Sequence, residues 1–253
     1  MEDMTSSSQP THDTVILDVD GTLADTNYLH ALAWARAFDR VDLHPPMWHL
    51  HRAIGMGGDK LVPAVAGDRA EQEHGDALRE AWEEEYAELL PEVRLLPGAR
   101  DLVIMLAERG LTVVLASSGK EQFTQHVLDL LDLPEGTLAA QASSDEAENS
   151  KPAPDVLEVA LNKVGEGSAL LVGDTPYDIA AAAKVGAPCA AVLTGGFGDD
   201  ELSRAGAVIV VDSAAALVSL DPGTWEDLLH AAPPDYATQT FSPLPAQPPG
   251  TDG

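Results

Sequence analysis

A short apolar run that ends in two aspartates constrains the fold of this chain more than any other feature. Residues 15–17 are Val-Ile-Leu, and Asp18, Val19, Asp20 and Gly21 follow directly. An apolar β-branched run predicts a buried strand, which delivers both carboxylates to the carboxyl edge of a sheet, where open α/β sheets bind ligands. Two neighbouring acids repel unless a cation lies between them or one holds a proton, so the pair indicates a metal or catalytic site. A solvated Asp-Gly turn is the alternative, and the pair alone does not decide.

Strand-like apolar runs recur later in the chain, at residues 111–116, 169–172, 190–193 and 208–211, with helical patterns between several of them. This alternation predicts an α/β fold with a Rossmann-like parallel sheet. About ninety residues separate the first two strands, where a dozen or two would suffice. The intervening residues have helical patterns, at 28–38 and 76–90, which predict an inserted α-helical cap domain.

The predicted domain boundaries follow from these patterns. We expect an α/β core at 14–25 and 93–230 and a helical cap at 26–92. Residues 1–13 and 231–253, which are rich in Ser, Thr, Pro and Gly, are expected to be disordered.

Composition limits the partners of this 253-residue chain. Its formal net charge is -28, from 42 acids against 14 Lys and Arg, which opposes binding to nucleic acid or to an anionic membrane. The single Cys189 cannot form an internal disulfide, and the chain has no zinc-type spacing of Cys and His. No apolar run approaches the roughly 20 residues of a spanning helix, and the first residues lack the pattern of a signal peptide. We therefore expect a cytoplasmic protein, either a monomer or a homodimer.

Three further motifs stand in order behind the first one, Asp18-Val19-Asp20-Gly21-Thr22-Leu23. Their residues are Val113 to Ala116 followed by Ser117 and Ser118, then Lys151-Pro152-Ala153-Pro154-Asp155, and then Gly173-Asp174-Thr175-Pro176-Tyr177-Asp178. Over about residues 14–215 the chain resembles the haloacid dehalogenase-like hydrolases. Within that superfamily it is similar to the group of phosphoglycolate phosphatases and β-phosphoglucomutases, which carry a helical cap between the first two motifs.

The resemblance implies a reaction and a cofactor. Asp18 attacks phosphorus to form an aspartyl-phosphate, and Asp20 acts as general acid and then as general base. Mg²⁺ is held by Asp18, by the main-chain carbonyl of Asp20 and by Asp174. Because Asp18 and a phosphate are both anionic, their approach requires cations, which Mg²⁺ and Lys151 supply.

The resemblance also implies how the phosphate is held. The hydroxyl of Ser117 and the backbone near Ser118 contact the phosphate oxygens, while Gly21 and Thr22 shape the turn that receives it. Asp178 has two interpretations of similar weight: it supports the metal site from behind, or it is an acid near the positive end of the following helix.

In the predicted cap, Arg52 and Lys60 flank a glycine-rich stretch that is a candidate hinge or substrate loop. Both cations are candidates for binding a second anionic group of the substrate, and surface pairing with nearby acids is the alternative. The neighbouring His49 and His51 are expected to be packing or surface residues.

The sequence thus predicts a Mg²⁺-dependent phosphatase that acts on a small phosphorylated metabolite. A β-phosphoglucomutase-type sugar phosphomutase retains both acids and stays open. Phosphonoacetaldehyde hydrolase, in which Lys60 would form the Schiff base, is a rival, but that enzyme usually lacks the second acid. Asp20 also argues against a dehalogenase, which has no alcohol to protonate. A non-catalytic binding module is expected to have lost Asp18, Asp20 or Lys151, and this chain retains all three.

Overall fold

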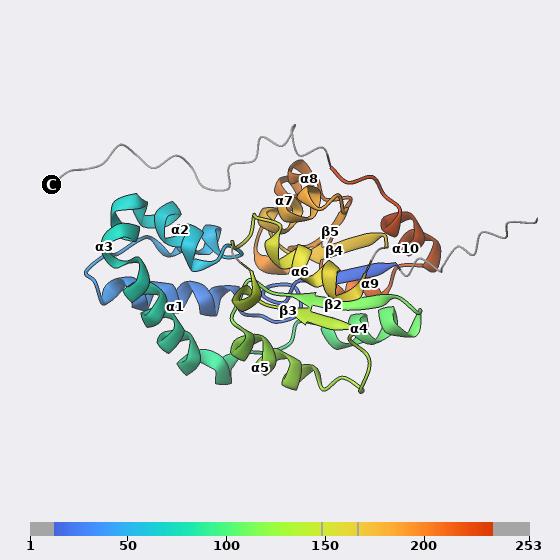
Figure 1. Ribbon diagram of the computed structural model, residues 1–253, viewed down its shortest axis with the longest axis horizontal. Coiled ribbons are helices and arrows are strands. Elements are labelled where there is room, and N and C mark those ends of the chain that lie inside the picture. Colours follow the sequence, from blue (N-terminus) through green and yellow to red (C-terminus); the bar gives the residue numbers. More distant parts are fainter. Residues whose placement is uncertain (1–12, 148, 166, 235–253) are drawn as a thin grey trace, which may run out of the picture.

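The computed structural model describes residues 13–147, 149–165 and 167–234 (Figure 1). Residues 1–12 and 235–253, which make up most of the two termini predicted to be disordered, lie outside the described residues. None of the described helices is long and apolar enough to cross a membrane.

The core is a sheet of six strands in the order β3-β2-β1-β4-β5-β6, and every neighbouring pair is parallel. The strands are β1 (Thr14–Leu17), β2 (Thr112–Ala116), β3 (Ala140–Ala142), β4 (Ala169–Gly173), β5 (Cys189–Val192) and β6 (Ile209–Val211). The predicted α/β class with a parallel sheet is confirmed. The edge strand β3 is the one that the sequence analysis missed, because its run Ala-Gln-Ala is only three residues long and has no β-branched or aromatic side chain.

Helices cover both faces of this sheet (Figure 1). They are α4 (Ala99–Glu108), α5 (Glu121–Leu131), α6 (Asp155–Val164), α7 (Pro176–Lys184), α8 (Asp199–Ala205), α9 (Ala214–Val218) and α10 (Pro222–Leu229). Side chains alternate along each strand, so Val15 and Leu17 pack into one apolar cluster and Ile16 into the other. The first cluster contains residues of α4, α5, α9 and α10, and the second contains residues of α6, α7 and α8.

Three helices lie between β1 and α4, and residues 26–92, which contain them, are called the helical insertion below. The helices are α1 (Asn27–Asp39), α2 (Met47–Ala53) and α3 (Gly58–Leu89), and a short 3₁₀ turn, Leu90–Glu92, follows them. They share an apolar cluster around Trp34, Phe38 and Leu78, beside the sheet in Figure 1. Helix α3 begins well before the residue 76 that the sequence pattern indicated, and it kinks at Gly67, whose φ of 86° a side chain would disfavour.

The strand order places the ends of β1 and β4 side by side. The chain runs from β1 to β2 and β3 on one side, then returns to β4 next to β1 and continues to β6 on the other side. This reversal is the position where open parallel sheets bind ligands. Leu17 pairs with Val172, so the residues that follow these strands emerge at the same edge.

Candidate active site

Lys151 and Asp18 form a buried ion pair at this edge. Lys151 Nζ lies 2.5 Å from Asp18 Oδ1 and 2.7 Å from Asp178 Oδ1, and its side chain is only 1% exposed. Burial disfavours the charged lysine, but Asp178 and Asp18 outweigh it and hold the pKa of Lys151 above its ordinary value. Asp178 in turn accepts hydrogen bonds from the backbone N–H and hydroxyl of Thr175, in the capping box that begins α7. Asp178 therefore has two roles: it pairs with Lys151 and it caps the N-terminus of α7.

Asp174, at the end of β4, brings a third carboxylate to the same point. One oxygen from each of Asp18, Asp174 and Asp178 lies within 4.8 Å of the others, and all three side chains are buried. The hydroxyl of Thr22 lies between two of them, 3.4 Å from Asp18 Oδ2 and 3.3 Å from Asp174 Oδ1.

The charges in this group are unbalanced. Burial raises the pKa of Asp18 to about 7 and that of Asp174 well above its ordinary value, because Lys151 alone does not compensate three buried acids. Converging carboxylate oxygens with an excess of negative charge are the donor set that a hard divalent cation prefers. These residues fit such a cation.

Asp20 lies in a different environment from Asp18. Its Oδ1 accepts hydrogen bonds from Thr26 Oγ1 at 2.7 Å and from His30 Nε2 at 3.0 Å, and its Oδ2 accepts one from Ser117 Oγ at 3.3 Å. Burial raises the pKa of Asp20, but the charge of His30 and the hydrogen bonds from His30 and Thr26 outweigh it, so the pKa lies below its ordinary value. Two aspartates two residues apart thus have pKa values shifted in opposite directions, which is typical of carboxylates with different catalytic roles.

His30 reaches Asp20 from α1 of the helical insertion and was missed by the sequence analysis. Its ring stacks on Tyr86, with centroids 3.9 Å apart, and on Trp82 at 5.6 Å. The signal was present: His30 lies four residues after Thr26, on a buried face of α1 where Asn27 is the other polar residue and the rest are apolar. A single histidine on such a face is usually a packing residue, and only the fold brings it to Asp20.

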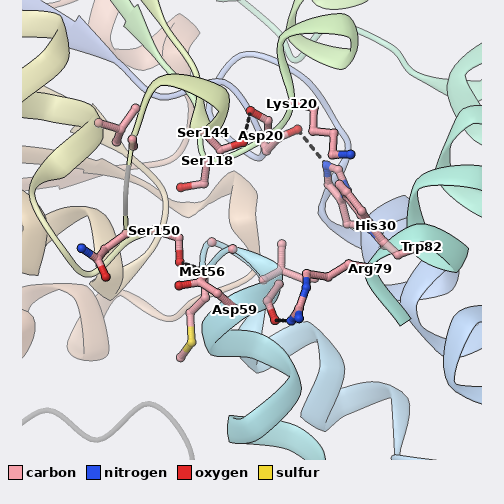
Figure 2. A pocket seen from close by; sticks show the side chains of 18 of the residues that line it. Asp20, His30, Met56, Asp59, Arg79, Trp82, Ser118, Lys120, Ser144 and Ser150 are labelled. Atoms are coloured by element: carbon pink, nitrogen blue, oxygen red, sulfur yellow. Dashed lines mark hydrogen bonds and ion pairs between the residues drawn. The ribbon is translucent and has the colours of Figure 1, made fainter. Parts of the chain in front are cut away.

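A cavity of about 270 Å³ opens beside the two aspartates (Figure 2). Asp20, Ser118 and Lys120 lie on one side, and Met56, Asp59 and Arg79 lie opposite, with His30 and Trp82 closing one end. The buried hydroxyl of Ser118 has no hydrogen-bond partner among the described residues, whereas Ser117 is engaged with Asp20 and with the N–H of Gly119. Ser118 is among the residues that line the cavity and Ser117 is not, while the hydroxyl role predicted for Ser117 stays a prediction.

Arg52 and Lys60, the two cations of the insertion that the sequence made candidates for substrate binding, lie outside the cavity lining. Arg52 pairs with Glu201 of α8 and places its guanidinium 4.2 Å from the centre of the Phe197 ring. Lys60 lies 3.4 Å from Asp59, and neither Arg52 nor Lys60 is among the residues that line the cavity. The lining cations are instead Arg79, which pairs with Glu71 and Asp76, and Lys120, which pairs with Glu83.

Comparisons with known proteins agree with this geometry. A family model of haloacid dehalogenase-like hydrolases matches residues 15–192. The chain is 31% identical to a phosphoglycolate phosphatase of Yersinia pseudotuberculosis over 72% of this chain and 81% of that one. It is 28% identical to a phosphoglycolate phosphatase of Aquifex aeolicus, over 72% of this chain and 84% of that one. The crystal structure of a hydrolase from Pseudomonas syringae superposes with a TM-score of 0.78 at 29% identity, over 85% of this chain and 99% of that one. The chain belongs to the haloacid dehalogenase-like hydrolase family.

Proposed function

We propose that this hydrolase is a Mg²⁺-dependent phosphatase that cleaves a small phosphate monoester through an aspartyl-phosphate on Asp18. The observation that carries the proposal is the division between Asp18 and Asp20 at one cavity. Asp18 is paired with a buried lysine and lies beside the carboxylates of Asp174 and Asp178. Asp20 instead accepts hydrogen bonds from Thr26 and His30. The phosphoglycolate phosphatases among the relatives support the same reaction class.

In the first step, a carboxylate oxygen of Asp18 forms a bond to phosphorus, and the bond from phosphorus to the ester oxygen breaks. The departing oxygen takes a proton from the carboxyl group of Asp20, so a neutral alcohol leaves. The pKa of Asp20 is low without substrate, and a phosphoryl dianion placed beside it raises that pKa because like charges disfavour ionisation. A dianionic substrate therefore favours the protonated form of Asp20 that the step needs.

In the second step, Asp20 is a carboxylate and removes a proton from a water molecule. The water oxygen forms a bond to phosphorus, the bond to Asp18 breaks, and inorganic phosphate is released. Thr26 and His30 hold Asp20 in place during both proton transfers. The net reaction is hydrolysis of one ester to one alcohol and one phosphate.

Asp18 and Asp174 would hold Mg²⁺, together with the main-chain carbonyl of Asp20 that the family resemblance implies. When bound, the ion neutralises charge on the phosphoryl oxygens. Lys151 contributes a fixed positive charge beside Asp18, and Asp178 keeps the ammonium in place.

The helical insertion, residues 26–92, would act as the cap that defines the substrate. It contributes Trp34, Trp82 and Arg79 to the cavity, while the core contributes the aspartates. The cavity volume of about 270 Å³ lies near the lower end for small-molecule sites, which suits a small metabolite. Lys60 is outside the lining and beside Asp59, so the structure offers no support for a Schiff-base mechanism at that lysine.

The test is a phosphate-release screen over phosphoglycolate, sugar phosphates and nucleotides, with Mg²⁺ and with a chelator. We expect release from at least one ester, dependent on Mg²⁺, with free alcohol and phosphate in equal amounts. An isomerised sugar phosphate without net release would instead identify a mutase. No turnover of any ester with Mg²⁺ would contradict the proposal.

A further inference from the structure

Asn27, the first residue of α1, makes a direct contact with the carboxylate of Asp174. Its Nδ2 donates a hydrogen bond to Asp174 Oδ2 at 2.8 Å and lies 3.3 Å from the carbonyl oxygen of Gly195. The side chain is 2% exposed. When Asp174 is ionised, as a metal ligand is, both neighbours of this nitrogen only accept hydrogen bonds. The amide orientation is then fixed, because a rotated amide would place its oxygen against two other oxygens.

The surroundings of Asp174 Oδ2 leave space for this amide and little else. A Cβ atom built on Gly21 would lie 2.3 Å from Asp174 Oδ2, and one built on Gly195 would lie 1.8 Å from it. Gly21 also has a φ of 77°, which favours glycine. The backbones of two glycines therefore pack closely around Asp174 Oδ2, and Asn27 donates the hydrogen bond that this oxygen accepts.

The other oxygen of Asp174 faces the opposite way. Thr22 Oγ1 lies 3.3 Å from Asp174 Oδ1 and 3.4 Å from Asp18 Oδ2, so Oδ1 is turned toward the nucleophile. With Oδ2 held by Asn27, the carboxylate is not free to rotate about its Cβ–Cγ bond. The remaining Asn27 Oδ1 has no hydrogen-bond partner among the described residues, as expected for a side chain selected for its donor.

We infer that Asn27 is a positioning residue that presents Asp174 to the metal ion and thereby sets the metal affinity, an inference that rests on the proposed Mg²⁺-dependent function. A neutral donor suits this position, since another carboxylate would add a buried charge and an apolar residue would leave Asp174 Oδ2 unsatisfied. Because Asn27 belongs to α1, its side chain joins the helical insertion directly to the carboxylate of Asp174 in the core.

The test is the affinity of the metal-free full-length protein for Mg²⁺, measured by isothermal titration calorimetry. Loss of a residue that orients a metal ligand typically costs 10–100-fold in metal affinity, and we expect a loss of that order in Asn27→Ala. His51→Ala is the matched control. His51 Nε2 lies 2.9 Å from the same Gly195 carbonyl and also comes from the insertion, but it forms no hydrogen bond with Asp174. The control should bind Mg²⁺ within twofold of the unmodified protein.

A purely structural role would lower the thermal stability of both variants and their Mg²⁺ affinity alike, and that result would overturn the inference. Equal affinity of Asn27→Ala and the unmodified protein would also overturn it while leaving the proposed function intact. Failure of the unmodified protein to bind Mg²⁺ would overturn both.

A second measurement uses the unmodified protein and therefore does not depend on whether a variant folds. The chain has three asparagines, Asn27, Asn149 and Asn162, so selective ¹⁵N-asparagine labelling of the side-chain amides gives three pairs of signals. We expect saturating Mg²⁺ to shift one pair of side-chain amide signals strongly, because the carboxylate that accepts its hydrogen bond becomes a metal ligand. Three unshifted amides in a protein that binds Mg²⁺ would overturn the inference.

Discussion

The ammonium of Lys151 lies 2.5 Å from Asp18 Oδ1, and both side chains are buried at the carboxyl edge of the sheet. The two residues are 133 positions apart, so the contact exists only because the sheet brings the loop between β3 and α6 back to the end of β1. A buried ion pair of this kind becomes costly when one partner is removed.

Lys151→Met should therefore destabilise the protein strongly. The change leaves Asp18 and Asp178 buried without a counter-charge, and breaking a buried pair typically costs about 3–5 kcal/mol. The free energy of unfolding is to be measured by urea titration at pH 8 in the presence of a chelator. Lys163→Met is the control, because Lys163 forms a partly exposed pair with Glu146 and should contribute less than about 1 kcal/mol. Similar losses of unfolding free energy in the two variants would show that the buried Lys151 pair stabilises the protein no more than the partly exposed Lys163 pair does.

Mg²⁺ should stabilise the protein more at pH 8 than at pH 6. Burial raises the pKa of Asp18 to about 7 in the folded protein, compared with 3.8 for an ordinary aspartate. The folded state thus holds this proton more tightly than the unfolded state, so the metal-free protein loses stability as the pH rises from about 4 to 7. Above pH 7 the carboxylate is free to bind the ion. The check is the shift in melting temperature on adding Mg²⁺ at the two pH values, and a larger shift at pH 6 would contradict the assignment.

Asp20→Asn should slow turnover without weakening the binding of a phosphate analogue. Asparagine retains the shape of Asp20 but cannot transfer the proton, and positioned acid–base catalysis typically contributes about 10²–10⁴-fold. We expect kcat to fall in that range while the Kd of orthovanadate changes by less than about threefold. A large loss of orthovanadate affinity with kcat unaffected would mean that Asp20 binds the phosphoryl group and does not transfer a proton in the reaction.

Arg79→Gln should lower kcat/KM for the preferred metabolite more than for p-nitrophenyl phosphate. Arg79 lines the cavity opposite Asp20, and a hydrogen bond to a charged group contributes about 1.5–3 kcal/mol, which corresponds to roughly 10–150-fold. Arg52→Gln is the comparison, since Arg52 is engaged with Glu201 and Phe197 outside the cavity lining. If Arg52→Gln has the larger substrate-dependent effect, the substrate role belongs to Arg52, as the sequence analysis considered.

The sequence was sufficient to predict the sheet and the carboxylates at its edge. Each of β1 and β4 is an apolar run followed by an aspartate, and parallel strands bring such residues together. Asp18, Asp174 and Lys151 meet as predicted from the motifs. The strand β3 was missed because a run of three residues is too short to give a periodic signal.

The cavity-facing residues of the insertion could not be predicted in the same way. Their roles depend on how α1 and α3 pack on each other and on the core, which a helical period does not specify. Thus Arg79 lines the cavity and Arg52 does not, although both are arginines on helices of the insertion. Asn27 and His30 were missed for the same reason: each acts on an aspartate that lies in a different element.

The most direct test of the central claim is the Mg²⁺-dependent release of phosphate from p-nitrophenyl phosphate by the unmodified protein and by Asp18→Asn. Asp25→Asn is the matched control, with the same substitution at an exposed aspartate of the same loop. The account predicts that Asp18→Asn abolishes release while Asp25→Asn retains it. Activity that persists in folded Asp18→Asn, or that is unchanged by a chelator, would contradict an aspartyl-phosphate mechanism at this site.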